Sequence, residues 1–403
     1  MPTTPLFDDD ADNVCLIINL FIQAGIENSE TLLDCINYQI FQWCTSDPIA
    51  SARYAVHVLS CSGEEFLHWK ERTRTFFDEG EFKNVNKRFN VLLDRSAKKI
   101  MLGQLYEHIL AVLYQRNSKI LPPLPRSITE TVIQLVGNDT DGFFCDLYCI
   151  YGEFLSIQGD GRGYVPPSVP FALAPTYRYL HYLDYLTTNS SANNADRLRL
   201  SRRNALVESD GSYCPIIAYP PFGVDIPDDQ FDQSLLPESF QTRRSELLYP
   251  LLGLRLLREG GRCGMILPIS VVESSDNTYQ EFRKYLVENS CVEAIIYLPS
   301  NMHKDFINTN CVLLMFSKGQ ETDSVFFYRR DDLLECEDFP RVLDDWANQS
   351  TPNALADKSK KYFVVPRTEI EQNGYDLSFA RYHKLEETHI DIEPVNDFVD
   401  EFQ

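Results

Sequence analysis

Residues 215–223 read PIIAYPPFG, an apolar run that ends abruptly at two prolines and a glycine. The run has the branched side chains that favour a buried β-strand, and the prolines end the strand because they cannot donate to a sheet ladder. In an open α/β sheet, ligands bind just beyond the carboxyl ends of such strands. A Pro-Pro-Phe step at that place presents a flat ring on a rigid backbone, which suits the stacking of a flipped base. The alternative is a proline-stiffened loop with a core phenylalanine, and this stretch alone does not separate the two.

Short apolar segments alternate with helical segments on both sides of this stretch. Such alternation predicts a largely parallel sheet covered by helices on both faces. The connection before the last strand holds no persuasive helix, so that strand is predicted to be antiparallel. The predicted strands are residues 143–149, 171–174, 197–200, 215–219, 263–269, 292–298 and 311–317, and the predicted helices are residues 175–186, 243–261 and 278–289.

The first part of the chain has a different pattern, with apolar residues at helical spacing and few β-branched runs. Its clearest helix is predicted at residues 96–117, SAKKIMLGQLYEHILAVLYQRN, before the helix-breaking segment ILPPLPRS. We therefore predict an α-helical N-terminal domain at residues 1–120, an α/β domain at 121–330 and a C-terminal extension at 331–403 that closes on the α/β domain.

The composition is that of a globular protein. The chain has 403 residues, of which 44% are hydrophobic, enough for a substantial core. Its N-terminus is acidic and no apolar run approaches the ~18 residues of a membrane span, so we expect a soluble cytoplasmic protein. Eleven scattered cysteines suit reduced buried thiols better than a disulfide framework. No CxxC or histidine-rich cluster accompanies them, and we expect no metal site.

The charge of the chain limits its contacts with nucleic acid. Thirty-seven basic and 59 acidic side chains leave a net charge of −22, which disfavours attraction to a polyanion by this chain alone. Contact with DNA would need a local basic patch or a basic partner. The candidate patches, although such clusters are more often solvated surface, are Arg197, Arg199, Arg202 and Arg203, then Arg243 and Arg244, and Lys98 and Lys99.

Several segments, in the correct order, are similar to those of one family. LGQLYEHIL (102–110) resembles the helix that precedes its cofactor domain, and residues 245–272 resemble its helix, Gly-Gly-Arg turn and following strand. Residues 281–319 and 369–382 match its last strands and closing segment. The family is that of the modification subunits of type I restriction-modification systems, within the adenine-specific DNA methyltransferases. The resemblance implies a Rossmann-like class I S-adenosylmethionine-dependent methyltransferase fold with a seven-stranded, mostly parallel sheet after an α-helical N-terminal domain.

The resemblance also implies a cofactor loop, which is altered here. The family pattern is Asp-Pro-x-Cys-Gly-Ser-Gly-Gly-Phe-Leu, whereas residues 146–155 read DLYCIYGEFL. Ile150 and Glu153 stand at glycine positions, where a missing side chain lets the backbone approach the ligand. The two side chains should crowd S-adenosylmethionine, and Glu153 should repel its carboxylate end. The retained candidates for cofactor binding are Asp146, Cys149, Gly152 and Phe154, and the family's acidic residue after the second strand has no match in FALAPTYRYL.

The second altered motif is the turn of the opening stretch. The family hallmark Asn-Pro-Pro-Phe-Gly corresponds to Tyr219, Pro220, Pro221, Phe222 and Gly223. By the resemblance, the asparagine and a proline carbonyl accept the hydrogen bonds of the adenine amino group, and this positioning supplies much of the rate. Tyr219 offers a hydroxyl from a different place. The degenerate catalytic motif is therefore Tyr219, Pro220, Pro221 and Phe222.

Three functions are compatible with these motifs. The first is a catalytically inactive methyltransferase-like protein that acts as a binding or regulatory subunit in DNA modification or defence, paired with a DNA-recognition subunit or an active methyltransferase paralogue. DNA would then be met only within a complex. The second is an active adenine-specific DNA methyltransferase with a variant YPPF motif. The third is an acidic interaction protein that imitates DNA, which the charge of −22 suggests although acidic solubility is the commoner explanation of such a charge.

Overall fold

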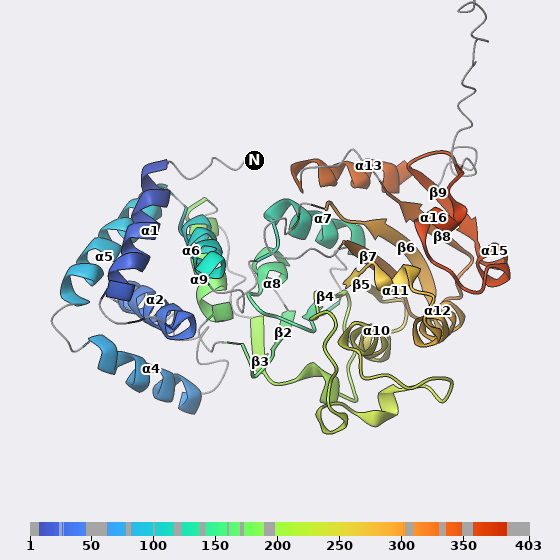
Figure 1. Cartoon of the computed structure of the whole chain (residues 1–403), viewed down its shortest axis with the longest axis horizontal. Helices are drawn as coiled ribbons and strands as arrows, with labels where there is room; N and C mark the ends of the chain where they lie inside the picture. The colour runs from blue at the N-terminus through green and yellow to red at the C-terminus, as the bar shows by residue number, and fades with distance from the viewer. Residues whose placement is uncertain are drawn as a thin grey trace, which may run out of the picture.

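The computed structural model of the chain describes residues 8–23, 26, 28–45, 63–77, 82–99, 101–116, 123–137, 142–158, 161–169, 173–188, 198–300, 302, 310–329, 336–348 and 358–384. Figure 1 shows two lobes, one made of helices and one built on a sheet. Among the described residues, no helix combines the length and the apolar character needed to cross a membrane.

The helical lobe contains the N-terminal helices and one helix from later in the chain. That later helix, α9, packs beside α6 (Figure 1). Apolar stripes on the helices meet in a core that includes Phe41, Phe66 and Trp69, whose rings contact one another edge-on or tilted. The helices are α1 (Asp8–Gln23), α2 (Ser29–Thr45), α4 (Gly63–Phe77), α5 (Phe82–Lys99), α6 (Leu102–Arg116) and α9 (Leu173–Thr188).

The helix predicted at residues 96–117 is in fact the end of α5 followed by α6. The break has a local cause, because the Asp184 carboxylate of α9 accepts hydrogen bonds from the backbone N–H groups of Leu102 (3.1 Å) and Gly103 (2.8 Å). A carboxylate in this position caps the start of α6. Gly103 also allows the close approach of α9, since a Cβ atom there would lie 2.3 Å from the ring of His181.

The described strands form one mixed sheet of nine strands in the order β3-β2-β1-β4-β5-β7-β6-β8-β9. Strand β7 is antiparallel to both of its neighbours, β5 and β6, as predicted for the last strand of the apolar series. Six of the seven predicted strands correspond to observed ones, and β8 and β9 extend the sheet beyond them. The strands are β1 (Cys145–Asp146), β2 (Gly161–Val165), β3 (Leu198–Arg202), β4 (Ile216–Ala218), β5 (Arg262–Pro268), β6 (Cys291–Tyr297), β7 (Cys311–Ser317), β8 (Ser324–Tyr328) and β9 (Tyr362–Pro366).

The strand predicted at residues 171–174 is wrong. Residues 171 and 172 lie outside the described residues, and Leu173 begins α9. The second strand is instead β2, which pairs with β1 and β3. Its two glycines hide the strand pattern, yet one of them is required by packing: a Cβ atom at Gly163 would lie 2.6 Å from Leu155 and 2.8 Å from the Cys149 sulfur.

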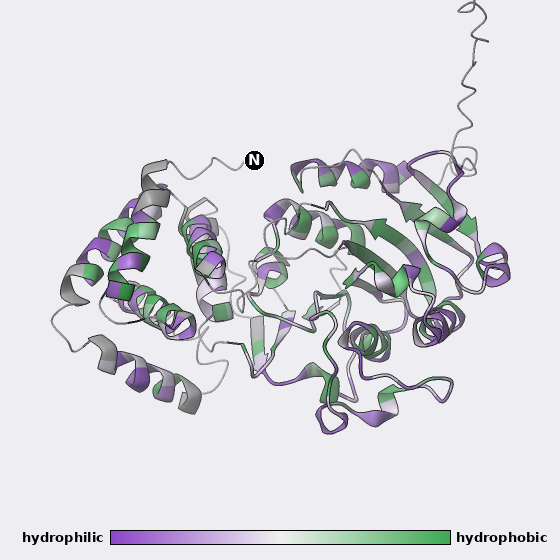
Figure 2. Ribbon diagram, in the orientation of Figure 1, coloured by the Kyte–Doolittle hydropathy of each residue, from purple (hydrophilic) through white to green (hydrophobic). Residues whose placement is uncertain are grey.

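Helices cover both faces of the sheet, as the alternation predicts (Figure 1). Along β7, Val312, Leu314 and Phe316 pack on one face, and Leu313 and Met315 pack on the other. Figure 2 shows the central strands in hydrophobic colours, whereas helices such as α12 have hydrophilic outer sides. The helices on the first face are α10 (Ser245–Leu256), α11 (Ser270–Glu273), α12 (Asn277–Asn289), α15 (Arg367–Gln372) and α16 (Phe379–Tyr382), and those on the second are α7 (Arg126–Val136), α8 (Glu153–Gln158) and α13 (Val342–Ala347).

This arrangement confirms the predicted class I methyltransferase fold preceded by a helical region. Short 3-10 helices complete the connections: η2 (Ala205–Val207), η3 (Asp228–Gln230), η4 (Gln233–Leu235) and η5 (Cys336–Arg341). The domain boundaries at residues 120 and 330 stay predictions.

Candidate functional site

The two altered motifs lie next to each other at one edge of the sheet. Strands β1 and β4 are parallel neighbours, with Asp146 beside Ile217, and the Leu147 N–H donates to the Ile217 carbonyl at 3.2 Å. The loop after β1 and the turn after β4 therefore leave the same edge together. This is the edge at which parallel sheets bind ligands.

The turn after β4 is held by the start of α10. The Ser245 hydroxyl donates to the Pro221 carbonyl at 2.6 Å, and the Ser245 N–H donates to the Val224 carbonyl at 3.0 Å. Gly223 has a φ of +64°, a left-handed conformation in which a side chain is strained. The predicted Pro-Pro turn is thus a fixed feature of the backbone.

The buried carboxylate of Glu246, on α10, stabilises the turn by hydrogen bonding. It accepts hydrogen bonds from the Gly223 N–H (3.1 Å) and the Tyr279 hydroxyl (2.8 Å), and it lies 3.2 Å from the Ser245 hydroxyl oxygen. The Arg244 guanidinium lies over the Tyr279 ring, 5.2 Å from its centroid. Sequence reasoning missed Glu246, although an acidic residue inside an otherwise apolar helix was a usable signal.

The side chains of Tyr219 and Phe222 lie together and are partly buried against the core on the α7 and α8 side of the sheet. Their ring centroids are 5.5 Å apart in an edge-on arrangement. Burial raises the pKa of the Tyr219 hydroxyl far above its usual range, and the charges of Cys311 and Glu153 add to the rise. Glu153 and Tyr219, which are substituted residues of the two motifs, are therefore close enough to interact electrostatically.

The loop after β1 bends tightly and is held to β2. The Asp146 carboxylate accepts the Tyr148 N–H at 3.0 Å, and the Cys149 N–H donates to the Tyr164 carbonyl of β2 at 2.9 Å. Burial raises the pKa of Asp146 well above its usual range, with a further contribution from the charge of Glu153. Asp146 is 1% exposed, so it is enclosed by the fold.

The remaining predicted loop residues have packing contacts. Gly152 has a φ of +78°, and a Cβ atom there would lie 3.0 Å from the Arg178 side chain of α9. Cys149 and Phe154 are buried in the core, and Ile150 packs against it. The retained glycine is therefore required both by its backbone conformation and by close packing.

Glu153 is the residue of the loop that is least compatible with ligand binding. It is the first residue of α8 and only 7% exposed. Its side chain lines a pocket together with Glu107, Tyr177 and His181. Burial raises the pKa of Glu153 to about 7, and the polar backbone groups of Glu153, Leu124 and Tyr151 oppose the rise.

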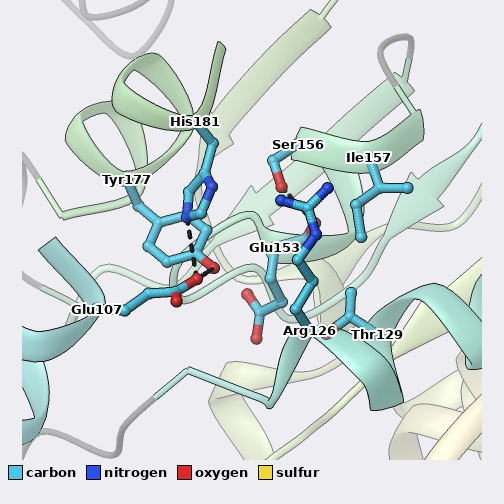
Figure 3. A pocket seen from close by; sticks show the side chains of 8 residues that line it. All are labelled: Glu107, Arg126, Thr129, Glu153, Ser156, Ile157, Tyr177 and His181. Atoms are coloured by element: carbon cyan, nitrogen blue, oxygen red, sulfur yellow. Dashed lines mark hydrogen bonds and ion pairs between the residues drawn. The ribbon is translucent and has the colours of Figure 1, made fainter. Parts of the chain in front are cut away.

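A small pocket opens beside Glu153, where the helical lobe meets the sheet (Figure 3). The Glu107 carboxylate of α6 accepts the Tyr177 hydroxyl at 2.8 Å and lies 3.0 Å from Nε2 of His181. Burial opposes the ionisation of Glu107, but hydrogen bonds and the charge of His181 lower its pKa. The sequence signal was Tyr177 and His181 at an i, i+4 spacing on a predicted helix, which places them on one face. The lining residues are Glu107, Arg126, Thr129, Glu153, Ser156, Ile157, Tyr177 and His181.

Most of the predicted basic patches have intramolecular partners. Arg202 donates to the carbonyls of Val169 and Pro167, both at 2.7 Å, and Arg203 pairs with Glu208 at 2.8 Å. Arg243 pairs with Asp228, and Arg244 lies over Tyr279. Arg197 lies outside the described residues, and Lys98 and Lys99 are exposed at the end of α5.

The residues present do not fit S-adenosylmethionine, the cofactor that the family resemblance implies. Glu153 is buried where the family motif has a glycine, and a cofactor carboxylate would be a second acidic group beside it. The chain after β2 offers no acidic residue for a ribose either, since none occurs between Val165 and Asp184. Within the described ranges no group of histidine, cysteine, aspartate and glutamate side chains could hold a metal ion.

Comparison with solved structures supports the fold. A type I restriction-modification system structure matches with a TM-score of 0.66 and 17% identity, covering 93% of this chain and 91% of the other. The type I restriction-modification methyltransferase subunit from Streptococcus thermophilus matches with a TM-score of 0.63 and 15% identity, covering 94% of this chain and 99% of the other.

Sequence comparison identifies relatives and a family. The chain is 21% identical to the type I restriction enzyme EcoEI methylase subunit of Escherichia coli, over 75% of this chain and 66% of the relative. It is 22% identical to the MpnII methylase subunit of Mycoplasma pneumoniae, over 74% and 60%. The chain thus spans less than two thirds of the length of these relatives. The N-6 DNA methylase model matches residues 167–391, more than half of the chain. The chain therefore belongs to the N-6 DNA methylase family.

Proposed function

We propose that this protein is a diverged, catalytically inactive member of its family that acts as a binding or regulatory subunit in DNA modification or defence. The observation that carries the proposal is the side chain at the start of the turn after β4. Tyr219 stands at the position of the asparagine in the family motif, and its ring packs against Phe222 and the core.

The chemistry of the family motif, as the resemblance gives it, needs an amide carbonyl at this position. That carbonyl accepts the adenine amino group and orients its nitrogen toward the methyl donor, which is catalysis by positioning. A tyrosine ring is longer and rigid, and its hydroxyl cannot occupy the place of the amide oxygen. The shape of the turn is retained by Ser245 and Glu246, while the group that would act on the base is absent.

The loop after β1 supports the same proposal independently. Glu153 is buried at one glycine position of the family motif, and Ile150 fills a second. Both steps of the family reaction, binding of the methyl donor and orientation of the base, thus lack their usual groups. We expect S-adenosylmethionine to bind weakly or not at all.

A protein partner is part of the proposal. The relatives are named as methylase subunits of type I restriction enzymes, and the net charge of −22 disfavours DNA binding by this chain alone. We propose a DNA-recognition subunit or an active methyltransferase paralogue as the partner, with DNA contacted only in the complex.

The decisive experiment measures incorporation of tritiated methyl groups into adenine-containing DNA. Three proteins are compared, each with and without a candidate recognition subunit: the wild type, Tyr219→Asn, and a combined variant that adds Ile150→Gly, Tyr151→Ser and Glu153→Gly. We expect no incorporation by the first two, and any activity only in the combined variant, because these groups act as a unit. Circular dichroism and thermal melting check that each variant is folded.

Robust incorporation by the wild type would contradict the proposal and favour an active methyltransferase with a variant YPPF motif. Calorimetry provides a second check. A dissociation constant of S-adenosylmethionine in the low micromolar range, about −8 kcal/mol, would also contradict it. If neither methyl transfer nor cofactor binding is found, displacement of DNA from a partner by this chain distinguishes a DNA-imitating protein from a regulatory subunit.

A further inference from the structure

Helix α5 is a strongly basic element of an acidic protein. It contains six lysine or arginine residues and one aspartate, whereas the whole chain has a net charge of −22. The single aspartate, Asp94, accepts a hydrogen bond from the indole N–H of Trp43 on α2 at 2.8 Å. The acidic groups that balance the charge of the helix therefore do not come from the helix itself.

One face of α5 is buried and the opposite face is exposed. The apolar side chains of Phe89, Leu92 and Leu93 pack in the core of the helical lobe. Because this apolar face is already covered, only the basic face is open to a partner. Its exposed residues recur at three- and four-residue intervals, which places them together on the helix surface. They are Lys87, Arg88, Val91, Arg95, Lys98 and Lys99.

The middle of the basic face is apolar. Val91 is 55% exposed, with Lys87 four residues before it and Lys98 seven residues after it. Among the described residues five large apolar side chains are exposed, and three of them, Leu16, Leu67 and Val91, lie on helices of this lobe. An apolar centre with a charged rim is the composition of a protein-binding surface.

We propose that the exposed face of α5 is the docking surface for an acidic amphipathic helix of a protein partner. The lysine and arginine side chains pair with the partner's carboxylates, and Val91 contacts its apolar side chains. Within the described part of the chain Lys87, Arg88 and Lys98 form no ion pair that an incoming carboxylate would have to break.

Two observations favour an acidic protein segment over nucleic acid. A phosphate backbone offers no apolar contact to Val91. A long polyanion would also meet the repulsion of a chain with a net charge of −22, whereas a short segment meets only the basic face. From Lys87 to Lys98 that face is about 16 Å long, which matches about three turns of a partner helix.

The position of α5 leaves the rest of the molecule accessible. Figure 1 shows α5 on the side of the helical lobe that faces away from the sheet. A partner on α5 therefore covers neither the turn after β4 nor the loop after β1. The inference rests on the proposed function in one respect, since it takes the partner to be a protein.

The test measures binding of a fluorescent peptide to the full chain by anisotropy. The probe is a synthetic helix of about 20 residues, in which leucines recur at three- and four-residue spacing among glutamates. The variant Lys87→Glu with Lys98→Glu is compared with Lys284→Glu and Lys360→Glu, which makes the same charge change at exposed lysines outside the helical lobe. We expect the α5 variant to weaken binding at least about tenfold and the control to weaken it less than about twofold.

The apolar centre is tested separately, with a second peptide in which glutamine replaces each leucine. It should bind the wild type about fivefold more weakly, and Val91→Gln should weaken binding of the first peptide to a similar extent. The comparison of the two peptides needs no variant, so it decides the question even if a substitution disturbs folding.

The proposal is overturned if the wild type binds neither peptide, if it binds both equally, or if the two double variants lose binding equally. Tighter binding of a DNA duplex than of the first peptide, abolished by the α5 substitutions, would assign the face to nucleic acid and also overturn it. Methyl transfer by the wild type contradicts the proposed function without changing peptide binding. A failure of peptide binding likewise leaves the methyl-transfer result unchanged.

Discussion

The turn after β4 and the loop after β1 lie side by side, yet they depart from the family motifs in opposite ways. The turn keeps its backbone, fixed from below by Glu246, and presents a different side chain, Tyr219. The loop has its bend at Gly152, but a buried acidic side chain, Glu153, stands at a glycine position of the family motif. The turn thus differs from its motif in one side chain on a fixed backbone, whereas the loop differs in a side chain that is buried within the fold.

This difference predicts different sources of stability at the two places. The turn is held by hydrogen bonds to Ser245 and Glu246 that do not involve Tyr219. The loop is held by the packing of its own side chains against the core. Measurements of the free energy of unfolding at the two places test whether the two sources differ.

The largest effect is expected at the turn, from Glu246→Ala. Glu246 is 1% exposed and its carboxylate accepts two hydrogen bonds, from the Gly223 N–H and the Tyr279 hydroxyl, so its removal leaves these donors without partners. We expect the free energy of unfolding to fall by about 3 kcal/mol. Chemical denaturation monitored at the α/β domain provides the measurement.

The control for this variant is Glu238→Ala, at an exposed glutamate between η4 and α10. It should change the free energy of unfolding by less than about 0.5 kcal/mol. If Glu246→Ala lowers the free energy of unfolding no more than the control does, the turn is held by its prolines alone and not by the hydrogen bonds of Glu246.

A pH dependence is the second expected effect, and it belongs to the loop. Burial raises the pKa of Glu153 in the folded protein to about 7, against 4.5 for an exposed glutamate in the unfolded chain. Because the folded protein holds this proton more tightly, the contribution to stability is fully present below 4.5 and is lost as the pH rises through 7. Between pH 5.5 and 8.5 the loss amounts to about 2 kcal/mol.

The measurement is the difference in unfolding free energy between the wild type and Glu153→Gln across this pH range. Glutamine keeps an acceptor oxygen but does not titrate, so other groups, including Glu107, Asp146 and His181, cancel to first order. We expect the wild type to lose stability relative to the variant with rising pH. A difference that does not change with pH would mean that the Glu153 carboxyl is ionised throughout this pH range. The loop would then be less buried than we infer.

Much of the fold followed from the sequence because the central strands are long and apolar. Strands β5, β6 and β7 each have seven residues, nearly all buried, and such runs are hard to mistake. Strand β2 was missed because Gly161 and Gly163 are there for close packing against Phe144 and Leu155. Glycine weakens a strand pattern for a reason that only the three-dimensional contact reveals.

The candidate site was predicted in part. The positions of the two motifs could be predicted from the order of segments along the sequence. The structure brings the loop and the turn together through the pairing of β1 with β4. The supporting residues were not readable, because Glu246, Tyr177 and His181 come from helices whose role depends on packing across the sheet or between lobes. Likewise, repulsion by Glu153 was expected from its charge, whereas its burial beside Glu107 and Tyr177 depends on contacts between distant segments.

The smallest effect distinguishes the two places most directly, because each has a glycine with positive φ. Gly152 has a φ of +78° and Gly223 a φ of +64°, so alanine at either position is strained by about 1–2 kcal/mol. At Gly223 a new Cβ atom meets nothing within 4 Å, but at Gly152 it lies 3.0 Å from the buried Arg178 side chain. We expect Gly152→Ala to destabilise the protein by about 1 kcal/mol more than Gly223→Ala, since overpacking adds to the backbone strain. Thermal melting of the two variants at neutral pH gives this difference, in which the strain common to both cancels. Equal losses of stability in the two variants would indicate that the Arg178 side chain moves aside freely. The loop after β1 would then be packed less tightly than we infer.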